Sequence, residues 1–223
     1  MINWDDIDTV LLDMDGTLLD LHFDTYFWLT HLPKRYSETH GVSEEAAKEK
    51  LMAHIKSHEG TLAWYCIDHW SEFLDLDIKA LKAEVQHKIK IRPFVMDFLT
   101  ALQALGKRLV LITNAHPKTL DIKLERTQID SALDIVISSH EFNQPKEAQA
   151  FWHALQAVER FDPARTLFID DTDNILQSAK DYGIAHLLCV HQPDSQIPRR
   201  AERFAAIDHF DEIMPAQSGL DLG

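Results

Sequence analysis

Two pairs of aspartates stand where runs of apolar residues end. Asp13 and Asp15 interrupt the stretch LLDMDGTLLD, and Asp170 and Asp171 close the run TLFIDD. Like charges about 4 Å apart repel by roughly 4 kcal/mol at an effective dielectric constant of about 20. If the pairs meet in the fold, a divalent cation would remove this repulsion. Oxygen ligands without a cysteine or an obvious histidine favour Mg²⁺ over Zn²⁺.

A threonine, an asparagine and a lysine follow other apolar runs. Thr113 and Asn114 end the run RLVLITN, and Lys146 follows Pro145, which is expected to open a helix. A lysine in the first turn of a helix opposes the helix dipole by roughly 0.5 kcal/mol unless an anion is bound nearby. A phosphoryl group held by Mg²⁺, Lys146 and the Thr113 hydroxyl would be such an anion. A carboxylate beside it could act as a nucleophile and form an aspartyl-phosphate.

Five short apolar runs are expected to bring these side chains together. They lack the alternation of a half-exposed strand and are separated by helical patterns: TVLLDMD (9–15), RLVLITN (108–114), DIVISS (134–139), TLFIDD (166–171) and HLLCV (186–190). Such runs suit strands covered on both faces, and the helices between them suit a parallel sheet. We therefore predict a doubly wound, Rossmann-like α/β fold. Its ligands should bind beyond the carboxyl ends of the strands, where the polar residues lie.

The interval between the first two runs contains helical patterns and no strand-like run. One helix is expected over residues 62–73, with Leu62, Tyr65, His69 and Phe73 on one face. Residues 20–91 are therefore predicted to form an all-helical lobe inserted after the first strand. The α/β core would then consist of residues 1–19 and 92–223.

Composition excludes several classes of protein. The formal net charge of −14 argues against nonspecific nucleic-acid binding, and no apolar run approaches the roughly 20 residues that span a bilayer. The N-terminal residues are acidic, unlike a secretion signal. Cys66 and Cys189 are far apart in apolar surroundings, so we expect buried free thiols in a reducing compartment. The expectation is a soluble, cytoplasmic, monomeric protein.

The motifs together resemble the haloacid dehalogenase superfamily of phosphatases. DMDGT carries Asp13 and Asp15, and the later motifs are a threonine after the second strand, a lysine before a later helix and a closing DD pair. This resemblance covers essentially the whole chain. It implies an enzyme, a phosphoric monoester hydrolase, with Mg²⁺ as its cofactor.

The resemblance assigns a role to each motif residue. Asp13 would be the nucleophile and a Mg²⁺ ligand. Asp15 would protonate the leaving oxygen, deprotonate the attacking water and bind Mg²⁺ through its backbone carbonyl. Thr113 and Lys146 would hold the phosphoryl oxygens, with Asn114 as a further contact. Asp170 and Asp171 would bind the metal, one directly and the other through water; the sequence leaves open which does which.

A closer resemblance suggests the substrate. In this family a helical insertion after the first motif is a cap that closes over the substrate, here of the type called C1. Four segments further resemble the branch of GMP/IMP 5′-nucleotidases: FDTYFW (23–28), LAWYCIDHWSE (62–72), TNAHP (113–117) and PKE (145–147). The resemblance therefore implies a purine nucleoside 5′-monophosphate, GMP or IMP, as the small phosphorylated substrate.

Other functions on this fold remain open. A phosphatase or phosphomutase acting on another small phosphomonoester, such as a sugar phosphate, would use the same residues. A dehalogenase has no need of the acid Asp15, because a halide leaves without a proton. A phospho-acceptor signalling module is a more remote alternative, since it has no inserted lobe and its acidic pair precedes the phosphorylated aspartate.

Several residues have both a functional and a structural interpretation. Aromatic side chains of the insertion could stack on a purine, although such residues are more often core: Tyr26, Trp28, Trp64, Tyr65 and Trp70. His54 and His58, one helical turn apart beside Glu59, could bind a transition metal, but a polar surface pair is the simpler interpretation. His116 should lie near the phosphate. Asp173 is interpreted as the N-cap of a helix.

Overall fold

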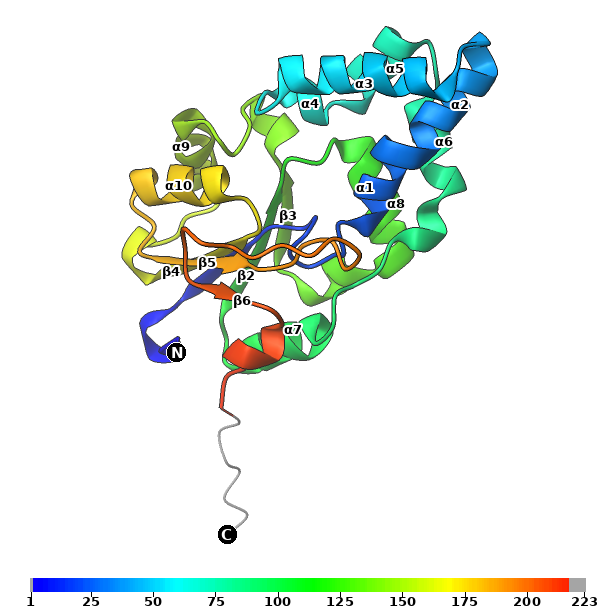
Figure 1. Cartoon of the computed structure of the whole chain (residues 1–223). Helices are drawn as coiled ribbons and strands as arrows, with labels where there is room; N and C mark the ends of the chain where they lie inside the picture. The colour runs from blue at the N-terminus through cyan, green and yellow to red at the C-terminus, as the bar shows by residue number, and fades with distance from the viewer. Residues whose placement is uncertain (1, 217–223) are drawn as a thin grey trace.

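Six parallel strands form one sheet at the centre of the molecule (Figure 1), and their order is β3-β2-β1-β4-β5-β6. The computed structural model describes residues 2–216. The strands are β1 (Thr9–Leu12), β2 (Arg108–Thr113), β3 (Ile135–Ser138), β4 (Thr166–Asp170), β5 (His186–Val190) and β6 (Ala206–Ile207). The first five occupy the five predicted runs, and the doubly wound α/β prediction is confirmed.

Helices cover both faces of the sheet. On one side of the sheet lie α9 (Gln149–Val158) and α10 (Asp173–Tyr182), and on the other lies α7 (Val95–Ala104), as Figure 1 shows. The strand residues alternate between these layers: Leu11 of β1 packs with the α9 and α10 cluster, whereas Val10 and Leu12 pack with the α7 cluster. This two-sided burial explains why the strand sequences are continuously apolar.

Between β1 and α7 the structure is helical. Its elements are α1 (His22–Tyr26), the π-helix η2 (Phe27–His31), α2 (Leu32–His40), α3 (Glu44–His58), α4 (Leu62–Tyr65), α5 (Ile67–Leu74), α6 (Ile78–Glu84) and the 3₁₀ turn η3 (Gln86–Lys88). We call residues 20–91 the helical segment. Leu19 and Ile91 form an antiparallel bridge, so the segment leaves and re-enters the core at one place. The division into two domains stays a prediction.

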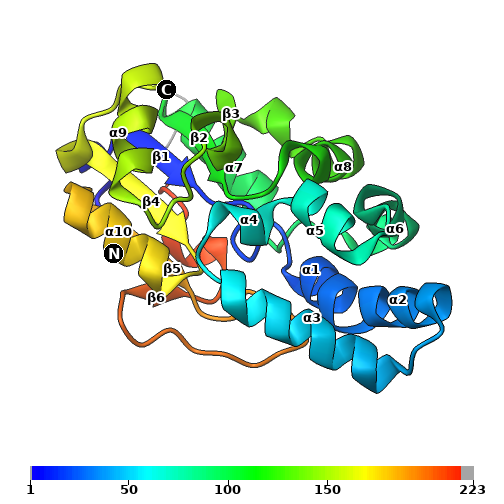
Figure 2. The same cartoon turned by 90° about the horizontal axis from the view of Figure 1, so that it is seen from above.

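The helical segment lies beyond one edge of the sheet. Seen from above in Figure 2, α6 lies beside α8 (Pro117–Thr127), which follows β2, and the two helices are in contact. Short 3₁₀ turns make up the remaining elements: η1 (Trp4–Asp6), η4 (Ile129–Ala132), η5 (Ser139–Phe142), η6 (Pro163–Arg165) and η7 (Phe210–Ile213). Within residues 2–216, no helix is both long and apolar enough to cross a bilayer.

The helix predicted over residues 62–73 is wrong as a single element. It breaks at Cys66, whose backbone is extended, and gives α4 and α5. The indole Nε1 of Trp70 donates a hydrogen bond of 2.8 Å to the carbonyl oxygen of Trp64. That carbonyl would accept a backbone bond if the helix continued, so the side chain caps the end of α4.

Two predicted helix starts are also wrong. Helix α9 begins at Gln149, and Lys146 lies in the turn before it, held by a bond from its N–H to Asn114 Oδ1. The helix-dipole argument for a bound anion therefore does not apply to Lys146. The N-cap of α10 is Thr172 rather than Asp173, which is the first helical residue. The Thr172 N–H donates to Asp170 Oδ1, which keeps this residue outside the helix.

Gly16 makes the turn after β1 possible. Its φ is +89°, and a Cβ built there would lie 2.7 Å from Asp171 Cγ and 2.8 Å from Pro193 Cβ. Side chains rarely adopt this backbone conformation, and contacts this short require neighbouring atoms to move. The sequence therefore needs glycine here for two independent reasons.

We predict that Gly16→Ala destabilises the fold more than Gly106→Ala. Gly106 has a φ of +68°, and a Cβ added there would meet no other group of residues 2–216 within 4 Å, so only backbone strain of about 1–2 kcal/mol applies. Gly16→Ala adds an overpacking cost of about 1–3 kcal/mol. Urea unfolding measures both values, and equal losses would contradict the close packing around Gly16.

Candidate active site

Lys146 links the two aspartate pairs. Its Nζ lies 2.5 Å from Asp13 Oδ1 and 2.7 Å from Asp170 Oδ2, and its side chain is 1% exposed. Burial alone would lower the pKa of Lys146, but Asp13 and Asp170 outweigh it and raise that pKa. The lysine therefore stays charged at the carboxyl edge of the sheet, between the ends of β1 and β4.

Three carboxylates gather around this lysine. Asp13, Asp170 and Asp171 are all buried, and each offers an oxygen within 4.8 Å of the others. Burial raises the pKa of Asp13 to about 6, and it also raises the pKa of Asp170 and of Asp171. Arg199 adds a second cation, with Nη1 3.7 Å from Asp171 Oδ2, but two cations do not balance three buried carboxylates when all three are ionised.

The cluster fits a hard divalent cation. Asp13 Oδ2 is buried and has no hydrogen-bond partner within residues 2–216. A buried acceptor left unpaired is costly, and a cation would satisfy it while keeping the carboxylates ionised. The donors are oxygens only, which suits Mg²⁺. The carboxylate of Asp15 is not in this cluster; its predicted role as a ligand concerns its backbone carbonyl.

Thr113 and Asn114 lie on the neighbouring strand end. Thr113 is buried, and its Oγ1 accepts a 3.0 Å bond from the Ala115 N–H. Its hydroxyl hydrogen therefore remains available to a ligand. Asn114 is held on both sides, because its Oδ1 accepts from the Lys146 N–H and its Nδ2 donates to Glu147 at 3.0 Å. The asparagine thus orders the turn that carries Lys146.

A second buried lysine, which the sequence motifs do not include, pairs with Asp15. Lys123 of α8 is 1% exposed, and its Nζ lies 2.6 Å from both Asp15 Oδ1 and Asp24 Oδ2. Asp24 also accepts from Lys82 of α6 at 2.7 Å. Helices α1, α6 and α8 and the loop after β1 thus share one chain of ion pairs.

This chain of charges gives the two aspartates different proton affinities. Burial raises the pKa of Asp15 to about 6, although Lys123 opposes the shift. For Asp24, burial also acts upward, but Lys123 and Lys82 together hold its pKa well below the usual range. A carboxyl that titrates near 6 can give and take a proton close to neutral pH. Asp15 suits that task, and Asp24 suits a permanently charged structural partner.

One cleft of about 460 Å³ joins these groups to the helical segment. Its polar floor contains all seven predicted site residues: Asp13, Asp15, Thr113, Asn114, Lys146, Asp170 and Asp171. Its opposite wall comes from the helical segment and includes Trp28, Met52, Ile55 and Trp64. The hydroxyl of Tyr65 donates to Glu147 at 2.8 Å and connects the wall to the floor.

The other aromatic residues of the segment lie elsewhere. Trp70 is fully buried and packs in the core, and Tyr26 is half-buried under the Lys88 ammonium. Cys189 is buried, whereas Cys66 is only half-buried, so the expectation of two buried thiols is wrong for Cys66. His116 reaches the cleft, as expected from its position after Thr113.

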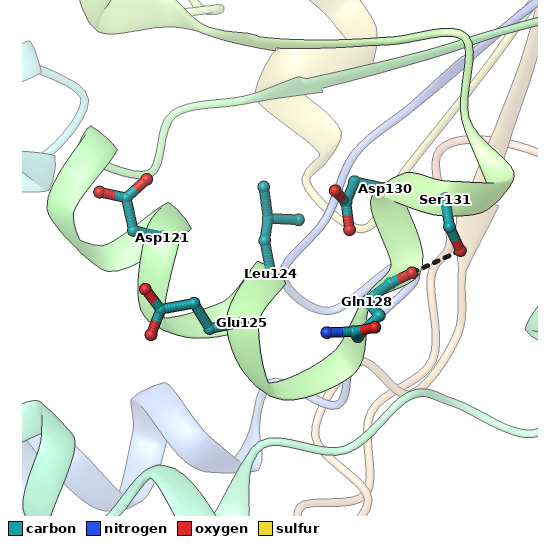
Figure 3. Close-up of a pocket in the computed structure, with 6 residues that line it drawn as sticks. All are labelled: Asp121, Leu124, Glu125, Gln128, Asp130 and Ser131. Atoms are coloured by element: carbon teal, nitrogen blue, oxygen red, sulfur yellow. Dashed lines mark hydrogen bonds between the residues drawn. The ribbon is translucent and has the colours of Figure 1, made fainter.

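A second hollow of about 360 Å³ lies on α8 and η4, lined by Asp121, Leu124, Glu125, Gln128, Asp130 and Ser131. Figure 3 shows these side chains spread along the surface, with one bond from the Ser131 hydroxyl to the Gln128 carbonyl oxygen. Its three carboxylates and lack of a cation would repel a phosphate ester. Of the two hollows, the cleft is therefore the better candidate for binding a phosphate ester.

Comparison with known proteins identifies relatives. Residues 7–183 match the family model described as haloacid dehalogenase-like hydrolase. Over 216 residues the chain is 44% identical to the GMP/IMP nucleotidase YrfG of Escherichia coli strain K12, which covers 96% of this chain and 97% of that protein. The protein of the same name from Shigella flexneri matches equally well.

Solved structures share the fold at lower identity. A HAD phosphatase from Thermococcus onnurineus superposes with a TM-score of 0.78 at 22% identity, covering 93% of this chain and 96% of that one. The L-2-haloacid dehalogenase of Xanthobacter autotrophicus superposes with a TM-score of 0.58 at 16% identity and the same coverage. One fold thus carries phosphatases and dehalogenases, so the site must decide between them.

We predict that Lys123→Met lowers the free energy of unfolding by about 3 kcal/mol, because Asp15 and Asp24, only 22% and 17% exposed, lose their shared cation and Asp24 keeps only Lys82. Lys118→Met on the same helix is the matched control. Lys118 pairs with Asp68 at 2.6 Å, but both side chains are about half exposed (47% and 53%), and such a pair contributes at most about 1 kcal/mol. Urea unfolding compares the two. Equal effects would contradict a special role for the buried lysine.

Proposed function

The chain belongs to the haloacid dehalogenase-like hydrolases, and we propose that it is a Mg²⁺-dependent phosphatase that hydrolyses GMP and IMP through an aspartyl-phosphate. The observation that carries this proposal is the placement of Asp13 at the floor of the cleft, where Oδ1 pairs with Lys146 and Oδ2 has no hydrogen-bond partner in the described part of the chain. The name of the relatives at 44% identity supports the choice of nucleotide.

Asp13 is the proposed nucleophile. One of its oxygens forms a bond to phosphorus, the bond from phosphorus to the 5′ oxygen breaks, and Asp15 gives that oxygen a proton. Asp15, now a carboxylate, takes a proton from water, and the resulting hydroxide attacks phosphorus and frees Asp13 and inorganic phosphate. Lys146 and the Thr113 hydroxyl hold the phosphoryl oxygens during both steps.

Asp13, Asp170 and Asp171 would hold the metal ion, together with the backbone carbonyl of Asp15. Bound Mg²⁺ would neutralise charge on the phosphoryl oxygens as the transition state forms. Lys146 already bridges Asp13 and Asp170 at 2.5 and 2.7 Å, so it keeps two of these ligands in place. Asp15 distinguishes this chemistry from dehalogenation, because an alkoxide leaving group needs a proton and a halide does not.

The wall of the cleft supports a nucleotide rather than a sugar phosphate. Trp28 and Trp64 offer aromatic faces, and Met52 and Ile55 add apolar surface. Glu59 lies at the same wall and is exposed. A carboxylate there can accept the N1–H that guanine and hypoxanthine share and that adenine lacks. We also propose that the helical segment acts as the cap over the substrate and that the enzyme is a cytoplasmic monomer.

We expect phosphate release from GMP and IMP in the presence of Mg²⁺ and none after chelation of the metal. AMP should be at least about tenfold poorer in kcat/KM, because losing one hydrogen bond to a charged group costs about 1.5–3 kcal/mol. Ribose 5-phosphate lacks the base and should be poorer still. The measurement is inorganic phosphate released from this panel of substrates.

Glu59→Gln is the matched variant for the panel, since it keeps the shape of the side chain and removes the charge. It should lower activity on GMP and IMP and leave that on ribose 5-phosphate unchanged. If ribose 5-phosphate equals GMP in the wild-type enzyme, the nucleotide assignment fails and the phosphatase assignment stands.

Asp13→Asn and Asp15→Asn should separate the two carboxylate roles. Asp13→Asn should abolish turnover of every substrate, and activity within about tenfold of wild type would rule out the nucleophile assignment. Asp15→Asn should lose about 10²–10⁴-fold on GMP and much less on p-nitrophenyl phosphate, whose leaving group departs without an acid. Equal losses on both substrates would argue against Asp15 as the acid.

A further inference from the structure

Three histidines meet on the helical segment, away from the acidic cluster. The sequence offers His54 and His58 one turn apart on α3, and the structure adds His69 from α5. Each of the three offers a ring nitrogen within 4.8 Å of the other two. All three are half-buried, so a small ion could reach them from solvent.

The three rings lie close to one another. His54 Nε2 and His69 Nε2 lie 2.9 Å apart, and the His58 ring centroid lies 4.1 Å from that of His54 and 5.0 Å from that of His69. Bonds of about 2.0–2.1 Å in a tetrahedral Zn²⁺ site place ligand nitrogens roughly 3.4 Å apart. The facing pair therefore needs to separate by only about half an ångström to accept an ion.

The second nitrogen of His58 is already engaged in a suitable way. Its Nδ1 lies 2.9 Å from Ser57 Oγ and 3.1 Å from the His54 carbonyl oxygen, and Ser57 donates its own proton to that same carbonyl. Nδ1 is therefore the donor in this group, which leaves a lone pair on Nε2. Metal-bound histidines commonly donate their other N–H to a carbonyl or carboxylate in this manner. The His54 ring is also fixed, because it stacks on Phe73 with 3.6 Å between ring centroids.

We propose that His54, His58 and His69 form a binding site for a borderline divalent cation such as Zn²⁺ or Co²⁺. Three imidazoles suit such ions and do not suit Mg²⁺, so this site differs in kind from the carboxylate cluster. On binding, the proton between the facing Nε2 atoms moves to Nδ1 of its own ring, and both Nε2 lone pairs turn to the metal. Water completes the coordination.

A metal at this site would fix α3 against α5. The C-terminal half of α3 contributes Ile55 to the cleft wall, and Trp64 of the intervening α4 lies on the same wall. The ion would therefore stiffen the wall that faces the substrate without touching the phosphate-binding residues. The test is independent of the proposed function, because it needs no substrate.

A second cluster must be distinguished from this one. Cys66, His116 and His140 also offer three ligand atoms within 4.8 Å of one another. Here the geometry is less suitable, because His116 Nδ1 accepts a 3.3 Å bond from the Lys118 N–H and its Nε2 consequently carries the proton. A thiolate in the coordination sphere would reveal this cluster by its charge-transfer absorption.

The experiment titrates Co²⁺ into the full chain, prepared without a polyhistidine tag and with Mg²⁺ in excess. We expect visible d–d absorption without a thiolate charge-transfer band. His58→Asn should lose about one molar equivalent of bound Co²⁺. His87→Asn, which removes an exposed histidine of the same segment, should lose none. Wild type should show slower amide hydrogen exchange at residues 58–66 with Zn²⁺, and His58→Asn should not.

His69→Asn provides a second variant, so the test does not depend on the folding of one protein. Unchanged Co²⁺ stoichiometry in a folded His58→Asn or His69→Asn variant would overturn the proposal. A charge-transfer band that disappears in Cys66→Ser, with the His58→Asn variant binding as the wild type does, would also overturn it and assign the ion to the second cluster.

Discussion

The arrangement of the site depends on the ion pairs that Lys146 makes with Asp13 and Asp170. The two carboxylates follow or end neighbouring strands of a parallel sheet, so the fold itself forces them together. Without a cation between them, burial and mutual repulsion would drive one of them to bind a proton. A protonated Asp13 would be a poor nucleophile, so the lysine that stabilises the fold also preserves the reactive form of the aspartate.

The same need for neutralisation couples the core to the helical segment. Lys123 of α8 holds Asp15 after β1 and Asp24 of α1 at equal distances of 2.6 Å, and Lys82 of α6 pairs with Asp24 from the other side. A movement of the segment that displaced Asp24 would change the charge around Asp15. The position of the proposed cap therefore affects the electrostatic environment of the proposed acid, Asp15, through the ion pairs of Asp24 and Lys123.

Much of the sheet and of the grouping of the candidate site residues could be predicted from the sequence, because the carboxyl ends of parallel strands share one edge of the sheet. From that rule alone, the four core aspartates, Thr113 and Lys146 are expected to lie near one another, whatever the helices do. The exact start of α9 depends on tertiary bonds, chiefly from Lys146 to Asn114, which no local pattern contains. Lys123 and Lys82 do carry a signal in the sequence that could have found them. Each stands beside an apolar residue on the buried face of its helix, where an unpaired lysine is unfavourable.

The charge balance also explains how a strongly acidic protein can bind a phosphate ester. A net charge of −14 disfavours the approach of anions overall, so attraction has to be local. Lys82, Lys123 and Lys146 line the cleft, but all three are already paired with aspartates. None of these lysines alone can therefore supply a net positive site. Asp13 Oδ2 has no hydrogen-bond partner among residues 2–216, and a divalent cation bound there would turn the most acidic part of the cleft into the part that attracts phosphate.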